Sequence, residues 1–278
     1  MIKKFKKIQL TILALGAVAL LGACGSAEGT SGGSANGVRT IDVAVPPDSK
    51  PLSYTNENGE LVGYEIDILK AVDEKLEDYS FNLLGVHDSA AEIGLDTGKY
   101  QMIAQGLFKS PTREEKYLIP EQHNGASLMR VYSNKKYSNI KSLDDLVGLT
   151  IFPPSPSGGV YNLLMAHNEE KPDKKLEFAT SDAGFTVAER LKDIESGKYD
   201  ALVLPSNLGA ADIIKLQNLE VNISDPVKVF PTFFMIYKSD ENKELVSKVS
   251  EALTELKDEG VLSKISIEYY GEDVFIYE

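Results

Sequence analysis

The chain has 278 residues, of which 42% are hydrophobic and 26% charged, a composition typical of globular proteins that argues against extensive disorder. Its formal net charge is −13, and without the four lysines of its first seven residues 25 basic residues face 42 acidic ones, a net charge of −17. Such an acidic chain is a poor partner for nucleic acid. Because the chain has a single cysteine, no internal disulfide can form, and the fold must be stabilised by burial alone.

The N-terminus has the pattern of an export signal. Lysines at positions 3, 4, 6 and 7 precede a mostly apolar run, Ile8 to Ala23, which is too short and too interrupted for a membrane-spanning helix. We therefore expect residues 1–23 to be removed from the mature protein.

The only cysteine, Cys24, follows Leu21-Gly22-Ala23 and precedes a run of Gly, Ser, Ala, Thr and Asn that ends at Gly37. This arrangement resembles the lipobox of bacterial lipoproteins. The resemblance implies that Cys24 becomes the new N-terminus, carries diacylglycerol and palmitate, and holds the protein on the outer face of the cell membrane through a flexible tether at residues 24–37. The alternative is a stray thiol left in a signal sequence.

In the first part of the mature chain, strand and helix patterns alternate, which predicts a mainly parallel sheet with helices on both faces. A hairpin is expected at 53–62 with Asn58-Gly59 at its tip. Ser89 and Glu92 predict a capping box at the start of a short helix that Gly98 ends. The expected strands are 40–45, 81–86 and 100–104, and the expected helices include 64–76 and 111–117.

In the second part, Ala126 to Tyr132 is a strand and the alternation then restarts. Ser142 is expected to cap a short helix, and Pro153 to Gly159 forms a loop before another helix. The expected strands are 149–152, 176–179, 200–204, 227–230 and 233–237, and the expected helices are 160–167, 186–196, 208–216, 242–259 and 261–270.

One segment repeats. Leu95 to Gln101 (LDTGKYQ) is echoed by Ile194 to Asp200 (IESGKYD), each a helix end, a glycine and the start of a strand. In the same register the loop at Gly106 corresponds to the loop at Pro205. Two similar lobes would therefore place two loops opposite each other, across a cleft. Two strands that cross between the lobes would form a hinge.

A candidate binding group follows the strand at 100–104. Ser110 suits a helix N-cap and Pro111 suits the first helical turn, so a helix begins directly after the loop and directs Arg113 beyond the strand end. In open α/β sheets this is where ligands bind, and the guanidinium fits a carboxylate. The alternative is that Arg113 pairs with Glu114, Glu115 or another surface carboxylate.

Four stretches resemble the extracellular solute-binding proteins of family 3, which serve ABC importers of polar amino acids. They are Glu57 to Asp67, Gly106 to Arg113 in the spacing G-x-x-x-[ST]-x-x-R, Ile140 to Leu146, and Glu259 to Ile265. The resemblance implies a two-lobed α/β fold of the type II periplasmic-binding-protein kind. Lobe 1 would comprise residues 38–129 and 230–278, and lobe 2 residues 130–229.

By this resemblance, Arg113 binds the α-carboxylate of the ligand, and the backbone near Gly106 and Phe108, with neighbouring Gln105, also contacts it. Backbone donors of Ser157 and Gly158, at a helix N-terminus in the other lobe, would meet the same carboxylate. Closure of the cleft on the ligand would produce the form that the permease recognises. No cofactor is implied, and a monomer is expected.

Three positions depart from the family pattern. Pro205, followed by Ser206, stands where an aspartate usually pairs with the ligand's ammonium group. Lys50 and Asp88 stand where aromatic residues commonly cover the ligand. These changes favour an unusual amino acid, a peptide-like ligand or an acid without the usual ammonium contact. Alternatively, Lys50 is a solvated loop residue, Asp88 helps to cap a helix, and Phe108 belongs to the core.

The predicted function is therefore a non-catalytic, lipid-anchored receptor that delivers a small carboxylate-bearing solute to an ABC permease. The alternatives are an exported enzyme on the same scaffold, such as a dehydratase, or a ligand sensor or adhesin that has lost transport. An enzyme would need an acid or base in the cleft, for which His87 and Asp88 are the suggestive pair. Neither they nor the other histidines have the spacing of a metal site.

Overall fold

The computed structural model describes residues 37–156 and 158–277, all of which belong to one compact unit. The signal sequence, Cys24, most of the tether and Ser157 lie outside the described residues. No helix among the described residues is both long and apolar enough to cross a membrane.

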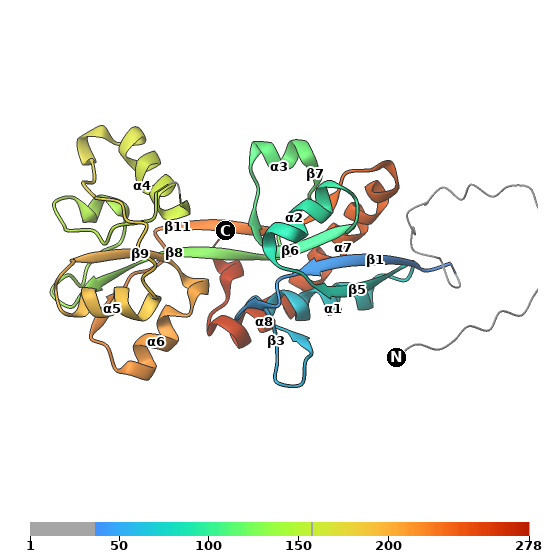
Figure 1. The fold of residues 1–278 in the computed structure, drawn as a ribbon, viewed down its shortest axis with the longest axis horizontal. Helices are drawn as coiled ribbons and strands as arrows, with labels where there is room; N and C mark the ends of the chain where they lie inside the picture. The colour runs from blue at the N-terminus through green and yellow to red at the C-terminus, as the bar shows by residue number, and fades with distance from the viewer. Residues whose placement is uncertain (1–36, 157, 278) are drawn as a thin grey trace, which may run out of the picture. The chain divides into compact units, whose positions relative to one another are not determined.

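The described chain forms an α/β fold around one eight-stranded sheet whose path runs β10-β8-β11-β6-β1-β5, with β7 beside β11 and β9 beside β8 (Figure 1). A small sheet, β2-β3-β4, carries the predicted hairpin, and Tyr54 pairs with Val62 across it. The strands are β1 (Arg39–Val45), β2 (Asp48–Ser49), β3 (Ser53–Thr55), β4 (Leu61–Val62), β5 (Tyr79–Gly85), β6 (Met102–Phe108), β7 (Tyr117–Leu118), β8 (Gly125–Asn134), β9 (Ala201–Pro205), β10 (Val221–Ile223) and β11 (Lys228–Tyr237).

Most of the predicted helices are confirmed. Ser110 caps α3 by accepting the N–H of Arg113 at 3.3 Å, and Thr186 caps α5 in a capping box with Glu189. The α-helices are α1 (Tyr64–Lys75), α2 (Asp88–Asp96), α3 (Pro111–Lys116), α4 (Gly159–Glu170), α5 (Val187–Glu195), α6 (Ala210–Gln217), α7 (Lys243–Asp258) and α8 (Val261–Tyr270). The 3₁₀ helices are η1 (Leu143–Leu146), η2 (Pro172–Lys174), η3 (Ser206–Leu208), η4 (Asp240–Asn242) and η5 (Val274–Ile276).

Several expectations are wrong. The capping box at Ser89 does not form, because α2 begins two residues earlier than expected, with His87 as its N-cap. No strand forms at 176–179, where the chain is irregular although Leu176 is buried. Residues 149–152 contribute only an isolated bridge between Ile151 and Ala201. The two apolar runs at 227–237 form the single strand β11.

The mainly parallel sheet is also a wrong expectation. Only β1 with β5 and β1 with β6 pair in parallel among the named strands, whereas β8 and β11 run antiparallel to their neighbours. The reason lies in the chain path. β8 and β11 each extend over ten residues and pair with one another as well as with β9 or β6, so they cross from one part of the sheet to the other.

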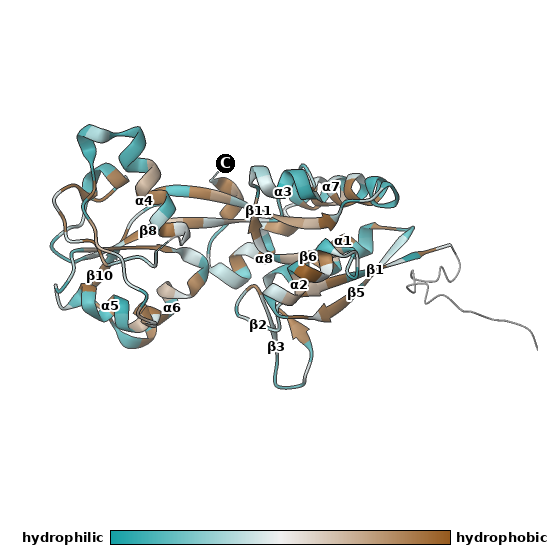
Figure 2. Cartoon of the chain, turned by 45° about the horizontal axis from the view of Figure 1, so that its top comes forward, coloured by the Kyte–Doolittle hydropathy of each residue, from teal (hydrophilic) through white to brown (hydrophobic). Residues whose placement is uncertain are grey.

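Four hydrophobic clusters cover the sheet, two on each face. Along β8, Ala126 and Leu128 pack in a cluster with α1, α7 and α8, whereas Val131 packs with α4 and Tyr132 with α5. Figure 1 shows α4 and α5 on opposite sides of β8 and β9, and Figure 2 shows the apolar colouring concentrated on the strands between polar helix surfaces. The long strands are therefore shared by two separate pairs of cores.

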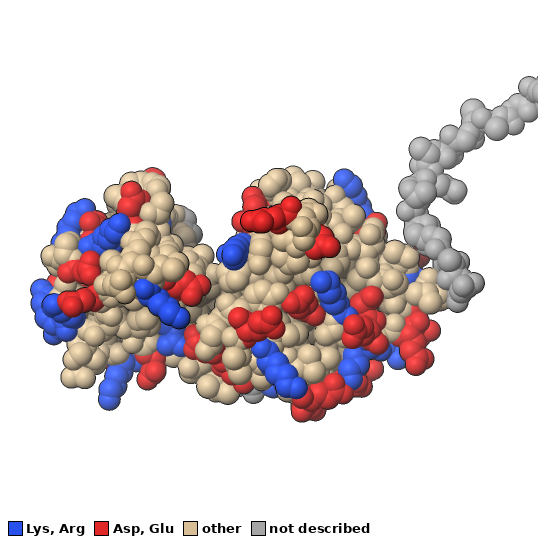
Figure 3. Space-filling model, turned by 90° about the horizontal axis from the view of Figure 1, so that it is seen from below, with Lys and Arg blue, Asp and Glu red and all other residues tan. Residues whose placement is uncertain are grey.

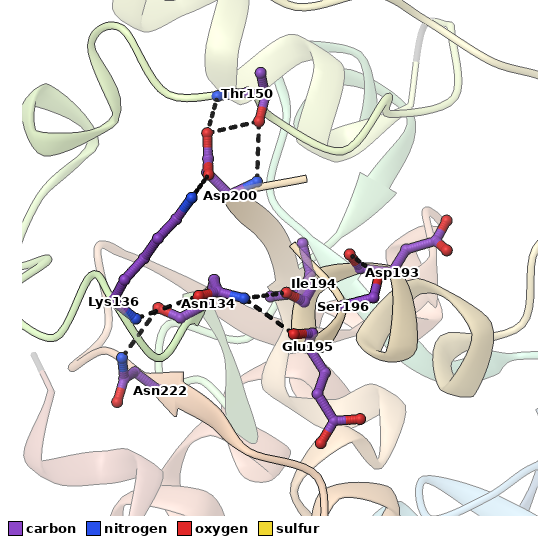
Figure 4. Close-up of polar contacts among 9 residues, drawn as sticks. All are labelled: Asn134, Lys136, Thr150, Asp193, Ile194, Glu195, Ser196, Asp200 and Asn222. Carbon is purple, nitrogen blue, oxygen red and sulfur yellow. Dashed lines mark hydrogen bonds and ion pairs between the residues drawn. The ribbon is translucent and has the colours of Figure 1, made fainter. Parts of the chain in front are cut away.

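The predicted internal repeat is confirmed in hydrogen-bonding detail. Gly98 and Gly197 end α2 and α5 with φ of 73° and 78°. The N–H of Gln101 donates to the carbonyl of Asp42 at 3.0 Å, and the N–H of Asp200 donates to that of Thr150 at 2.8 Å. The side chains of Gln101 and Asp200 accept equivalent hydrogen bonds from the backbone. Gln101 accepts the N–H of Asp42 at 3.0 Å, and Asp200 accepts that of Thr150 at 2.9 Å (Figure 4).

Candidate functional site

A cavity of about 230 Å³ lies where the two repeated strand ends meet. Phe108 at the end of β6 contributes one wall, and Pro205 at the end of β9 contributes another. Between them lies the N-terminus of α4, which the loop Pro153 to Gly158 leads into. The first-turn N–H groups of an α-helix have no acceptor within the helix, so this wall can donate to an anion. The lining residues are Phe108, Met129, Phe152, Pro153, Pro154, Ser155, Gly158, Gly159, Val160, Arg190, Leu202, Val203, Leu204, Pro205 and Leu208.

Arg113 lies beside this cavity but does not line it. Its guanidinium Nη1 donates to the carbonyl oxygen of Phe108 at 3.0 Å, and its Nη2 lies 3.5 Å from a carboxylate oxygen of Glu92 on α2. The Arg113 side chain is 29% exposed and that of Glu92 48%, so this ion pair is weak and solvent-screened. The alternative expectation, a pair between Arg113 and a surface carboxylate, is found, and the guanidinium lies at the end of β6. Its binding of a ligand carboxylate stays a prediction.

The end of β6 is shaped by a bulge and a buried carboxylate. Between the pairs Leu107–Phe233 and Ile103–Met235, β6 has more residues than β11, and Gly106 in this bulge has φ of 62°. Glu65 on α1 is fully buried and accepts the N–H of Gly106 at 3.1 Å. Glu65 falls within the stretch Glu57 to Asp67 that resembles the family, but nothing local in the sequence indicates that its carboxylate is buried against Gly106, because it lies next to the apolar stripe of α1.

The pKa of Glu65 is raised from 4.5 to about 7. Burial is the main cause, and the bonds from Gly106 and from Asn124 oppose it only in part. Asn124, just before β8, donates to Glu65 at 3.0 Å. The same carboxyl group thus links the loop at the end of β6 to the start of a crossing strand.

The predicted site residues are only partly brought together. Phe108 and Gly158 line the cavity, although the N–H of Gly158 is donated to the carbonyl of Ser155 at 3.1 Å. Gly106 commits its N–H to Glu65. Ser206 lies in η3, directly after the cavity residue Pro205.

Three further predicted residues lie away from the cavity lining. Gln105 donates weakly to the carbonyl of Asp88 at 3.4 Å, and Asp88 is in the first turn of α2. Lys50 is exposed, with its ammonium 5.2 Å from the ring centre of Tyr54. Their contact with a ligand stays a prediction.

Arg190 lines the cavity although it was not among the predicted site residues. This residue of α5 lines the cavity, stacks its guanidinium 5.8 Å from the ring of Phe152 and donates through Nε to the carbonyl of Phe185 at 3.1 Å. An arginine on an amphipathic helix usually faces solvent, so no local signal distinguishes it. Among the described residues, no three His, Cys, Asp or Glu side chains are grouped in a way that could hold a metal ion.

Two α/β parts that share two long strands, with a cavity where equivalent loops meet, define the class of two-lobed ligand-binding proteins. The family described as bacterial extracellular solute-binding proteins, family 3, matches residues 41–272, and the chain belongs to it. Members of this family are binding proteins rather than enzymes. The family is extracellular, which supports export of this protein.

Individual relatives are consistent with this family assignment. The probable amino-acid-binding protein YxeM of Bacillus subtilis (strain 168) is 30% identical over 275 residues, which cover 98% of each chain. The L-cystine-binding protein TcyK of the same organism is 24% identical and covers 92% of this chain and 93% of its own.

Solved structures show the same fold. The probable amino-acid ABC transporter extracellular-binding protein ytmK of Bacillus subtilis matches with a TM-score of 0.71 at 23% identity, covering 85% of this chain and 99% of that one. The unliganded, open L-cystine solute receptor of Neisseria gonorrhoeae matches with a TM-score of 0.67 at 24% identity, covering 84% and 94%. The fold is thus that of the type II periplasmic binding proteins, as expected from the sequence motifs.

Proposed function

We propose that this protein is the substrate-binding lipoprotein of an ABC importer, and that it captures an amino acid or a related carboxylate. The observation that carries the proposal is the cavity between Phe108, the N-terminus of α4 and Pro205, with Arg113 at its edge. The names of the relatives, which include amino-acid-, cystine- and arginine-binding proteins, support this class of solute.

In the proposed complex, Arg113 exchanges its screened pair with Glu92 for a bidentate pair with the ligand's carboxylate. The amides of Gly159 and Val160, in the first turn of α4, donate to the same group. Because these donors come from the two sides of the crossing strands, binding favours closure of lobe 2 (residues 130–229) on lobe 1 (38–129 and 230–278). The closed form is delivered to the permease and its ATPase.

The side chain of Pro205 carries no charge and cannot form an ion pair with an ammonium group. An amino acid would therefore lack the acidic partner that the family pattern has at this position. The proposal accordingly includes derivatives and other acids, and the polar residues Gln105, Lys50, Asp88 and Ser206 would supply other contacts on closure.

The test is a thermal-shift screen of amino acids, dipeptides and organic acids with the exported domain. A carboxylate-bearing ligand raises the melting temperature of the wild type by mass action, by several degrees at 100 times its dissociation constant. The Arg113→Ala variant should lose this shift. Lys116→Ala is the matched control, because Lys116 lies on the same short helix and pairs instead with Asp96. An undiminished shift in Arg113→Ala would reject Arg113 as the carboxylate anchor.

We further propose that the mature protein is anchored to the membrane by lipid on Cys24 and acts as a monomer. Replacement of Cys24 with serine should release the protein from the membrane fraction and abolish lipid labelling. Loss of solute uptake on deletion of the gene would support transport. Ligand binding with unaffected uptake would favour a sensor instead.

A further inference from the structure

A second and larger cavity, of about 520 Å³, adjoins the first. Phe108, Met129 and Gly159 line both, so the two spaces meet at the end of β6 and the N-terminus of α4. The second cavity then follows the flank of α4 toward η1 and the start of β11. Its lining is Phe108, Met129, Ser142, Leu143, Asp144, Gly159, Asn162, Leu163, Ala166, His167, Glu170, Lys171, Val227, Lys228 and Phe230.

The inner wall of this cavity is apolar. Phe108 and Phe230 stack with ring centres 5.1 Å apart, although they come from different strands. The strand register explains this contact. Phe108 is opposite Thr232, and Phe230 lies two residues before Thr232 in β11, so its side chain is on the same face. Met129 of β8 and Leu163 of α4 continue the apolar wall.

Three ionisable residues of the outer wall contact one another, and Glu170 and Lys228 add further charge to the same rim. The carboxylate of Asp144 accepts from the ammonium of Lys171 at 2.7 Å and lies 3.8 Å from the ring of the buried His167. The His167 ring Nε2 is also 3.2 Å from the carbonyl oxygen of Lys174. A long uncharged group would therefore meet apolar side chains inside and a polar, charged rim outside.

Size separates the two cavities. Sites for drug-sized ligands have volumes of about 300–1,000 Å³, a range that includes the second cavity and excludes the first. The smaller space, lined by the helix N-terminus, suits a head group.

We propose that the larger cavity binds the body of the transported solute. The solute class is a carboxylate-headed molecule with an elongated, uncharged body of apolar character, and Phe108 and Phe230 select for that body. This inference rests on the proposed function, because the head group must be held at the α4 N-terminus for the body to enter the second space.

The test uses a homologous series with one head group: L-alanine, L-norvaline, L-norleucine and L-2-aminooctanoate. Isothermal titration at fixed pH and salt should show affinity rising about fourfold for each added methylene that is buried. A series with constant affinity would overturn the inference.

The Ala166→Phe variant fills the cavity from an exposed position on α4, so folding is little affected. It should lose at least about tenfold in affinity for L-2-aminooctanoate while affinity for L-alanine changes by less than about twofold. The matched control is Ala211→Phe on the exposed surface of α6, which lines neither cavity and should bind both probes as the wild type does.

The outcomes distinguish this inference from the proposed function. Equal losses for both probes in Ala166→Phe, or no loss for either, would reject the second cavity as the site of the body while leaving the head-group site intact. Absence of binding by every member of the series, together with a negative thermal-shift screen, would reject the carboxylate site and the inference with it.

Discussion

The carboxylate of Glu65 accepts the N–H of Gly106 through both of its oxygens, each at 3.1 Å, although Glu65 is fully buried and Gly106 lies in a strand bulge. The bond fixes the loop that carries Phe108 and Arg113 to the first helix of the fold. Asn124 adds a bond at 3.0 Å from the base of β8. A buried, titratable carboxyl group therefore stabilises the loop of the candidate site.

We predict that this group makes the folded protein less stable as the pH rises from about 4.5 to about 7. The pKa of Glu65 is about 7 in the folded protein against an ordinary 4.5, so the native state retains a proton that the unfolded state releases. The free energy of unfolding should fall by about 3 kcal/mol across this window and then stay level. Urea unfolding at pH 5, 6, 7 and 8 measures it.

The Glu65→Gln variant checks the assignment, because a neutral amide of similar shape cannot titrate. Its stability should vary much less between pH 5 and pH 8. Carboxylates whose pKa is lowered, such as Asp96 and Asp145, lose their contribution only at lower pH and do not confuse the result. The same pH profile in the variant and the wild type would show that another group is responsible.

A second prediction concerns the backbone at Gly106. An alanine there must adopt φ of 62°, and its Cβ would lie 3.2 Å from Cδ1 of Leu52. Gly106→Ala should therefore cost about 1–3 kcal/mol of unfolding free energy and weaken ligand binding by displacing the loop. Gly209→Ala is the matched control, because it has φ of 70° with no atom near the added Cβ. If the two variants lose the same stability, the packing against Leu52 is unimportant.

A third prediction concerns Asp200, the counterpart of Gln101 in the repeat. Burial raises its pKa, but hydrogen bonds from Thr150 and the ion pair with Lys136 at 3.0 Å outweigh burial and lower the pKa to about 2 (Figure 4). Stability from this group is present above the ordinary pKa of 3.8 and is lost as the pH falls toward 2.

Asp200→Asn should retain an acceptor for Thr150, as Gln101 does for Asp42, but lose the pair with Lys136. We expect a loss of about 1–2 kcal/mol at pH 7 and a smaller further loss on acidification to pH 3, measured by urea unfolding. Asp240→Asn removes an exposed pair with Lys243 and should change stability little. Equal effects of the two substitutions would contradict the structural role of Asp200. Charges of both signs are interspersed over the face that Figure 3 shows. Exposed pairs are screened by solvent, so they are poor candidates for such an effect.

A fourth prediction concerns the crossing strand β8. Arg130 is 11% exposed, donates to the carbonyl of Ser224 at 2.7 Å and pairs with Glu272 of the C-terminal segment at 2.5 Å. Glu272→Ala leaves a largely buried guanidinium without its carboxylate and should cost about 2–4 kcal/mol. Glu241→Ala breaks a pair with Arg39 at 3.9 Å in which the glutamate is 83% exposed, and it should cost less than about 1 kcal/mol. Denaturant unfolding of both variants compares them, and a small effect of Glu272→Ala would show that Ser224 alone satisfies Arg130.

Local chemistry made much of the fold predictable. The N-cap at Ser110, the hairpin tip at Asn58-Gly59 and the glycine stops at Gly98 and Gly197 depend on neighbouring residues alone, and all are found. Where local signals were weak, prediction was wrong: Ser89 competed with His87 for the N-cap, and short apolar runs such as 176–179 were buried without pairing as strands.

By itself, the sequence determined most of the helices, several of their caps, the repeat and the family, because periodicity, turn chemistry and motifs are properties of contiguous residues. Only the tertiary structure decided which strands pair antiparallel, that Glu65 is buried beneath Gly106, that Arg190 faces the cavity and that Phe108 stacks on Phe230. These relationships join residues far apart in the chain, and their energies depend on burial and on the partner presented by another element, which no local pattern encodes.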